Sequence, residues 1–133
     1  TILGILSTVG FANFQNSRIK AKDIARKTDL QTIAKSLEAY ANDYRAYPNS
    51  SNGKIQVNGS SINWGSSFQD ANTTYITRLP VDPSGYDYFY EKSGSGYYIY
   101  AYLENSQDPA ISSYSGKSCG SQTCNYRISS SNL

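Results

Sequence analysis

The chain has 133 residues with two cysteines and neither histidine nor methionine, which suits one modest domain built around one core. Its 12 Lys and Arg residues against 10 Asp and Glu give a formal charge of +2, too balanced to indicate direct nucleic-acid binding. The absence of histidine excludes Ser-His-Asp and Cys-His catalysis and histidine-based zinc sites. We therefore predict no enzyme activity, no catalytic residues, no metal and no cofactor. The lack of an initiator methionine indicates a processed or truncated chain.

The segment 1–17 carries no charged residue and is predicted to be helical and apolar on nearly all sides. Its apolar and small residues include Ile2, Leu3, Gly4, Ile5, Leu6, Val9, Phe11 and Phe14. A complete membrane span needs about 20 mainly apolar residues, so this segment suits the second half of one. The alternative is an ordinary buried helix.

The segment 18–45 is predicted to continue the same helix with one polar face, because it contains no Gly or Pro and many charges. Five residues recur at steps of three and four and are predicted to face a sheet: Leu30, Ile33, Leu37, Tyr40 and Tyr44. A helix from residue 2 to about residue 44 would be on the order of 60 Å long, so its first half must project from the domain.

Pro48 is predicted to stop the helix. The segment 49–74 is rich in Asn, Ser and Gly and is interpreted as a variable loop, within which residues 54–58 could form a short strand.

The segment 86–103 is predicted to be a hairpin whose strands, 86–91 and 97–103, are joined by a five-residue loop, 92–96. Symmetric closure of that loop would place six tyrosines on one face: Tyr86, Tyr88, Tyr90, Tyr98, Tyr100 and Tyr102. Phe89 would then lie opposite Ile99 on the face that packs against the helix. The tyrosines would serve either sheet stability or an intersubunit or ligand contact.

The tail 104–133 contains both cysteines, Cys119 and Cys124. Two thiols cannot complete a tetrahedral zinc site, so a local disulfide is predicted, which favours a protein outside the cytoplasm. Two free thiols in a cytosolic protein are the alternative.

In this order, these features resemble the type IV pilin and type II secretion pseudopilin superfamily. The most specific portions are Thr1 to Leu6 as part of the hydrophobic segment, Leu79-Pro80-Val81-Asp82-Pro83 before the hairpin, and a strand ending in Leu103-Glu104. The resemblance implies an α+β pilin fold, in which a long N-terminal helix packs on a small antiparallel sheet. The chain departs from many pilins at Ala12, where they carry a proline.

The resemblance also implies a function: a major pilin of an extracellular type IV pilus, anchored in the inner membrane before assembly. Residues 1–17 would then form the filament core, and residues 18–133 the globular domain. The partners would be identical subunits in a helical polymer and the assembly machinery in the membrane, and the roles would include adhesion, twitching motility or DNA uptake. Five basic residues near the membrane exit could pair with adjacent subunits or form a solvated face: Arg18, Lys20, Lys22, Arg26 and Lys27.

The first alternative is a major pseudopilin of a type II secretion system, which the Leu79 to Pro83 element favours. Those pseudopilins commonly bind calcium through an acidic C-terminal loop, but only Glu104 and Asp108 lie in the matching region here. The second is a membrane-anchored binding module with Trp64 and the tyrosines as its platform. A hydrolase using Asp82 and Asp87 is the remaining alternative, although a turn already accounts for Asp82.

Overall fold

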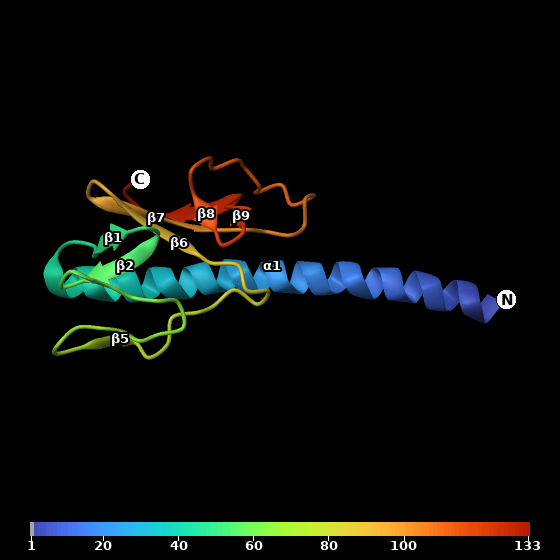
Figure 1. The fold of residues 1–133 in the computed structure, drawn as a ribbon, viewed down its shortest axis with the longest axis horizontal. Coiled ribbons are helices and arrows are strands. Elements are labelled where there is room, and N and C mark those ends of the chain that lie inside the picture. Colours follow the sequence, from blue (N-terminus) through green and yellow to red (C-terminus); the bar gives the residue numbers. More distant parts are fainter. Residues whose placement is uncertain (1) are drawn as a thin grey trace.

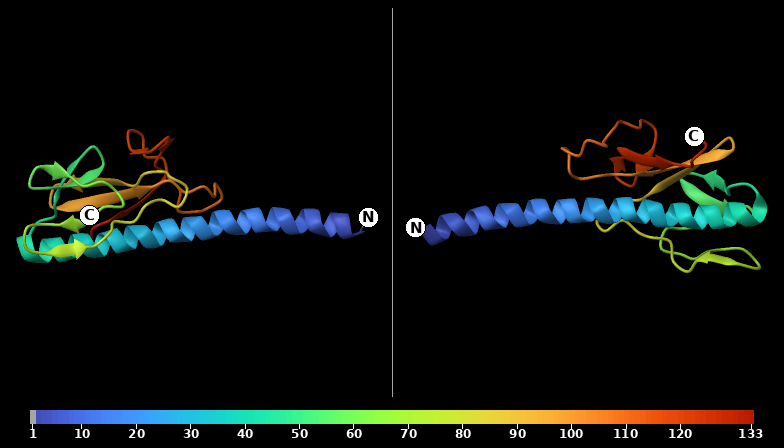
Figure 2. Two further views of the ribbon diagram at one scale, coloured as in Figure 1. Left: turned by 60° about the horizontal axis from the view of Figure 1, so that its bottom comes forward. Right: turned by 180° about the vertical axis from the view of Figure 1, so that it is seen from behind.

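The computed structural model describes the backbone of residues 2–133 and the side chains from Phe14 onward. One long helix, α1 (Ile2–Tyr44), runs the length of the molecule (Figure 1). Its 43 residues correspond to roughly 65 Å. The N-terminal half extends beyond the globular domain in all three ribbon views (Figures 1 and 2). The expected α+β pilin arrangement is confirmed.

Residues 4–12 are helical as part of α1. Among the described residues, no helix combines the length and the apolarity needed to cross a membrane. At its other end α1 ends at Tyr44, shortly before Pro48, the residue predicted to stop it. Arg45 adopts a left-handed conformation (φ 56°), and its amide donates to the Ala41 carbonyl at 2.7 Å, which satisfies a carbonyl of the last turn.

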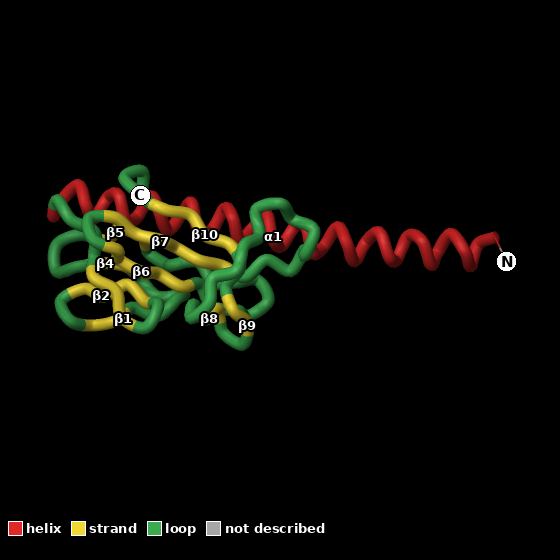
Figure 3. The backbone as a smooth tube through the Cα atoms, turned by 90° about the horizontal axis from the view of Figure 1, so that it is seen from above, coloured by secondary structure: helices red, strands yellow, loops and turns green. Residues whose placement is uncertain are grey.

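Short antiparallel strands cover the C-terminal half of α1. A central sheet has the order β10-β7-β6, formed by β6 (Phe89–Ser93), β7 (Gly96–Ala101) and β10 (Tyr126–Ser129) (Figure 3). A second sheet has the order β1-β2-β3, formed by β1 (Asn49–Ser51), β2 (Lys54–Val57) and β3 (Ser60–Ser61). Two hairpins complete the fold: β4 (Phe68–Gln69) with β5 (Thr74–Ile76), and β8 (Ser118–Cys119) with β9 (Gln122–Thr123).

The prediction of a loop over 49–74 is wrong in part. Strands β1 to β3 form there because two tight turns reverse the chain, at Asn52-Gly53 and at Asn58-Gly59, and all four residues have positive φ; β4 also lies in this segment. The β4–β5 hairpin lies along the opposite side of α1 from the central sheet (Figure 1).

The predicted register of the hairpin is also wrong. Ser93 pairs with Gly96, so β6 and β7 are joined by a two-residue turn in which Gly94 has φ 58°. Tyr90 therefore pairs with Ile99. A shift of one residue moves every side chain of one strand to the other face.

The six-tyrosine face consequently does not exist. Tyr88, Tyr90 and Tyr97 belong to the core beside α1, together with Ile99. The outer face of the sheet groups other aromatic residues with the disulfide: Phe89, Tyr98, Tyr100, Tyr102 and Tyr114. The tyrosines are divided between the two faces of the sheet because Gly94-Ser95 alone makes the turn.

Candidate functional site

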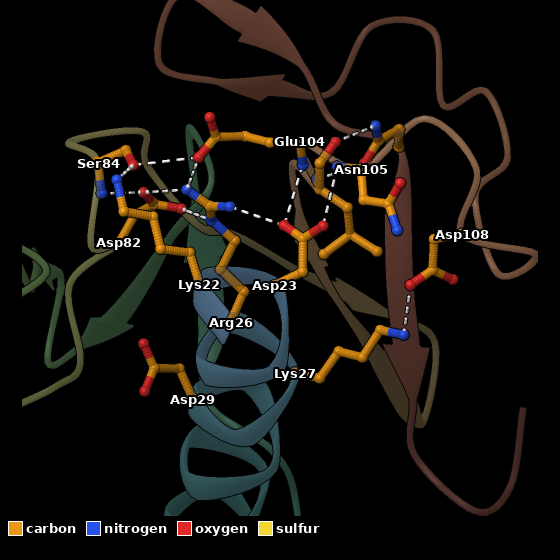
Figure 4. Close-up of polar contacts among 12 residues, drawn as sticks. Lys22, Asp23, Arg26, Lys27, Asp29, Asp82, Ser84, Glu104, Asn105 and Asp108 are labelled. Carbon is orange, nitrogen blue, oxygen red and sulfur yellow. Dashed lines mark hydrogen bonds and ion pairs between the residues drawn. The ribbon is translucent and has the colours of Figure 1, made fainter. Parts of the chain in front are cut away.

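A buried arginine joins three separate segments of the chain where α1 enters the globular domain. The Arg26 guanidinium is fully buried and donates to the Asp82 carboxylate through Nε (2.7 Å) and Nη2 (3.1 Å). It also donates to Asp23 Oδ1 (2.7 Å) and Glu104 Oε1 (2.6 Å). Figure 4 shows the three carboxylates surrounding the guanidinium. We call these four residues the Arg26 cluster.

Local sequence positions each member of the cluster. Asp23 and Arg26 extend the inward-facing stripe of α1 toward its N-terminus at helical steps of three and four. Asp82 is fixed by its own turn, because its Oδ1 accepts a hydrogen bond from the Ser84 amide at 2.7 Å. Glu104 follows the end of β7. The helix, the turn before the hairpin and the end of the central strand therefore meet at one cation.

The charges in the cluster depend on one another. Burial opposes ionisation of Arg26, but hydrogen bonds to Asp82, Glu104 and Asp23 outweigh it and raise the pKa of the guanidinium. Burial likewise acts against the charged form of Glu104, yet hydrogen bonds from Arg26 and Ser84 and the nearby positive charges together outweigh it and lower the pKa of that carboxyl. Arg26 and Glu104 thus each favour the charged form of the other.

The same face of α1 holds the loop that follows β7. Asp23 accepts the backbone amides of Glu104 (3.0 Å) and Asn105 (2.9 Å) with its two oxygens. One position after Arg26, the Lys27 ammonium donates to Asp108 Oδ2 at 2.7 Å. Both ends of the 104–108 segment are therefore tied to one turn of helix.

These contacts bear on the basic residues that could have paired with adjacent subunits. Arg26 and Lys27 instead pair within their own chain, and Lys22 donates to Ser84 at 3.1 Å. Arg18 and Lys20 lie exposed on α1. The interpretation as a basic surface is wrong for Arg26, which is the most completely enclosed cation of the described residues.

The five helix residues predicted to face a sheet share one side of α1. Leu30, Ile33 and Leu37 are fully buried. Tyr40 is partly buried and stacks on Tyr44, with ring centroids 4.5 Å apart. Tyr44 is 50% exposed, and its hydroxyl donates to the Asp70 carboxylate in the β4–β5 turn. The stripe thus faces the sheets over its first three residues and the β4–β5 hairpin at its end.

Tyr88 and Tyr90 in the core each donate a hydrogen bond through the hydroxyl. Tyr88 donates to Asp29 Oδ2 at 2.5 Å, and Tyr90 donates to the Pro48 carbonyl at 2.7 Å. Burial raises the pKa of both phenols. These tyrosines are therefore core residues with satisfied hydroxyls.

The predicted filament-core residues lie apart from this domain. Of that set, the side chains of Ile2, Leu3, Gly4, Ile5, Leu6, Val9 and Phe11 lie outside the described residues. Phe14 is 58% exposed on the projecting helix. Its ring packs only locally with Arg18, whose guanidinium carbon lies 5.8 Å from the ring centroid.

The two cysteines form a disulfide between β8 and the residue after β9. Cys119 and Cys124 are both fully buried and pack against Tyr100 on the outer face of the central sheet. The bridge thus closes a small hairpin that covers this face.

The alternative sites do not assemble. Asp82 is buried beneath Arg26, whereas Asp87 is exposed, so the two do not flank a common cleft. Trp64 is half-buried and meets Tyr88 edge-on, with ring centroids 5.9 Å apart. A groove of about 520 Å³ lies instead between α1 and the 104–107 segment.

A profile of the family described as type II secretion system, protein G matches residues 13–110. The chain belongs to this family. It is 33% identical over 100 residues to the type II secretion system core protein G of Pseudomonas aeruginosa, which covers 71% of this chain and 66% of that protein. The chain thus spans just under two thirds of that relative. No solved structure matches it.

Membership confirms the superfamily resemblance and favours the pseudopilin alternative over the type IV pilin. The match contains all members of the Arg26 cluster and ends before the disulfide hairpin. The cluster therefore belongs to the portion of the chain that the family shares.

The acidic loop that would hold calcium in such a protein does not fit that role here. Its carboxylates, on Glu104 and Asp108, are already bound by Arg26 and Lys27. From Phe14 onward, no group of three or more carboxylate or cysteine side chains is placed to hold a metal ion. The chain therefore fastens this loop with its own cations.

Proposed function

We propose that this chain is the major subunit of a pseudopilus, the helical filament of a type II secretion system. Its family membership over residues 13–110 carries the proposal. Before assembly the subunit would be anchored in the inner membrane by its N-terminal segment. On assembly the same segment would pack among identical subunits in a periplasmic filament.

The architecture supports a filament subunit. The N-terminal part of α1 extends beyond the domain (Figure 2), and the sequence carries no charge before Arg18. A domain this size cannot cover such a segment, so other chains or lipid must do so. One repeated contact that does not close on itself generates a helical polymer.

The role is structural rather than catalytic. The described carboxylates lie in ion pairs, turns or hydrogen bonds to tyrosines, or are exposed singly as Asp87 is. Partners would be copies of this chain and the secretion machinery of the membrane.

The extracellular type IV pilus remains a second candidate, because two features favour it. The C-terminal hairpin is closed by a disulfide, and the loop carboxylates are paired internally. Adhesion, twitching motility and DNA uptake belong to this candidate.

Electron microscopy and mass spectrometry of isolated filaments test the proposal. Filaments built mainly of this chain support it, together with loss of protein secretion when the gene is deleted. Surface fibres of this chain with normal secretion support the type IV pilus. A chain that stays monomeric in the membrane refutes both.

A matched pair of variants tests the filament core. Ile5→Asp places a charge in the uncharged segment and is expected to abolish filaments. Leu133→Asp makes the same kind of change at a half-exposed residue of the globular domain and should leave assembly intact. Equal assembly by both variants would show that residues 1–17 do not form the core.

A further inference from the structure

The loop after β7, residues 104–111, is organised around one aspartate. Asp108 Oδ1 accepts the Ala110 amide at 2.9 Å, its amide donates to the Asn105 carbonyl at 3.0 Å, and its carbonyl accepts the Ile111 amide at 3.2 Å. Only Oδ2 points away from these turns, and it accepts the Lys27 ammonium at 2.7 Å. Figure 4 shows Lys27 reaching this oxygen from α1.

We propose that Lys27 and Arg26 replace a divalent cation in this loop, so that its folding is independent of calcium. The two cations come from adjacent positions of one helical turn, and each binds one of the two loop carboxylates: Arg26 binds Glu104, and Lys27 binds Asp108. A bound ion would cross-link the loop to itself, whereas these side chains cross-link it to α1.

The coordination chemistry of calcium supports the replacement of an ion by these two side chains. Calcium takes six to eight oxygen ligands and favours several carboxylates. Both Asp108 oxygens already have partners, and hydrogen bonding to Lys27 lowers the pKa of that carboxyl. Hydrogen bonding to Asp108 in turn raises the pKa of Lys27, so the ammonium stays charged across the physiological range. An entering ion would have to displace a cation that the fold supplies.

Hydrogen bonds and a disulfide hold the tail beyond the loop. The Asn125 side chain makes two hydrogen bonds with the Leu103 backbone: it accepts from the amide at 2.7 Å and donates to the carbonyl at 3.0 Å. The disulfide between Cys119 and Cys124 closes the hairpin just before it. Two hydrogen bonds therefore join the end of β7 to the tail.

Thermal melting of the purified chain with excess calcium or with a chelator tests calcium independence. We expect melting temperatures that agree within about 1 °C. A specific ion at 100 times its Kd would raise the melting temperature by on the order of 10 °C in a chain of this size. A rise of that order on adding calcium, or calcium binding in a calorimetric titration, would overturn the proposal.

Charge exchange tests the role of the Lys27–Asp108 pair. Lys27→Glu and Asp108→Lys should each lower the melting temperature by several degrees, and the double variant should regain at least half of the loss. Lys35→Glu, an exposed position on the same helix, is the matched control and should change it little. Additive losses in the double variant would show that the two charges do not act together. Neither measurement depends on filament formation, so failure here is distinguishable from failure of the proposed function.

Discussion

Replacing Arg26 with methionine should destabilise the domain strongly, because three carboxylates would lose their shared cation. Methionine retains an unbranched apolar stem but supplies no donor, which leaves the buried Asp23 and Asp82 without their cation. Removing one partner of a buried ion pair costs about 3–5 kcal/mol. Because the Glu104 side chain is 25% exposed and can be hydrated, we expect the low end, about 3 kcal/mol.

Urea denaturation followed by Trp64 fluorescence measures this loss, since the only tryptophan lies half-buried against Tyr88. Arg78→Met, at an exposed position, is the control and should stay within about 0.5 kcal/mol of the parent. Adding Asp82→Asn to the Arg26 variant removes one unpaired charge and should recover part of the loss. A loss below about 1 kcal/mol for Arg26→Met would refute this account of the cluster.

The pH dependence provides a second check with a definite sign. The lowered pKa of Glu104 contributes stability that is present above its usual value of about 4.5 and is lost as the pH falls through the folded value. Without Arg26, burial still opposes ionisation of Glu104, so acidification would protonate that carboxyl and remove an unfavourable partly buried charge. The stability gap between parent and variant should therefore narrow as the pH falls from 7 toward about 4.

Three further variants test the packing of the domain. Leu37→Ala removes a fully buried side chain and should cost about 3 kcal/mol in urea denaturation. Gly53→Ala should cost at least about 1 kcal/mol more than Gly59→Ala, because both glycines have positive φ but only at Gly53 would a new Cβ overlap the Phe89 ring. Reducing the disulfide should lower stability by about 2 kcal/mol for so short a loop, as measured by thermal melting with and without reductant; no change would show that the hairpin holds without it.

The helix and the overall class could be predicted from the sequence because they depend on long, periodic patterns. Leu30, Ile33 and Leu37 repeat at helical spacing over several turns, and they are the residues that the structure buries completely. The hairpin was harder because its register depends on how many residues form one turn. Placing a five-residue loop where Gly94-Ser95 suffices reversed the faces of Phe89 and its neighbours.

Other features left too weak a local signal. Strand β10 is four residues long and forms only by pairing with β7, which lies more than twenty residues earlier in the chain. The Arg26 cluster depends on three distant segments, yet the sequence carries a signal for the two members that lie on α1. Asp23 and Arg26 fall on the same helical stripe as Leu30, and a charged pair on an inward stripe predicts a buried partner.

The position of the Arg26 cluster suggests why a buried network is kept where apolar residues could pack. An apolar stripe such as Leu30 to Leu37 tolerates sliding by one helical turn, which would move the projecting segment by about 5.4 Å. An arginine that must meet carboxylates on two other segments, Asp82 and Glu104, permits only one register. Buried polar groups fix register in other helical assemblies. The cluster would then determine how far the N-terminal part of α1 extends beyond the domain.

A neutral version of the cluster separates register from stability. Replacing Arg26 with Met, Asp23 and Asp82 with Asn, and Glu104 with Gln removes every charge together, although Asn at position 23 can accept only one of the two backbone amides that Asp23 binds. Such replacements are often neutral or stabilising, so urea denaturation should show a smaller loss than Arg26→Met alone. If register is the purpose of the cluster, this variant should nevertheless form fewer or irregular filaments in electron micrographs. Filaments identical to those of the parent would show that the other contacts of α1 fix the helix without the charges of the Arg26 cluster.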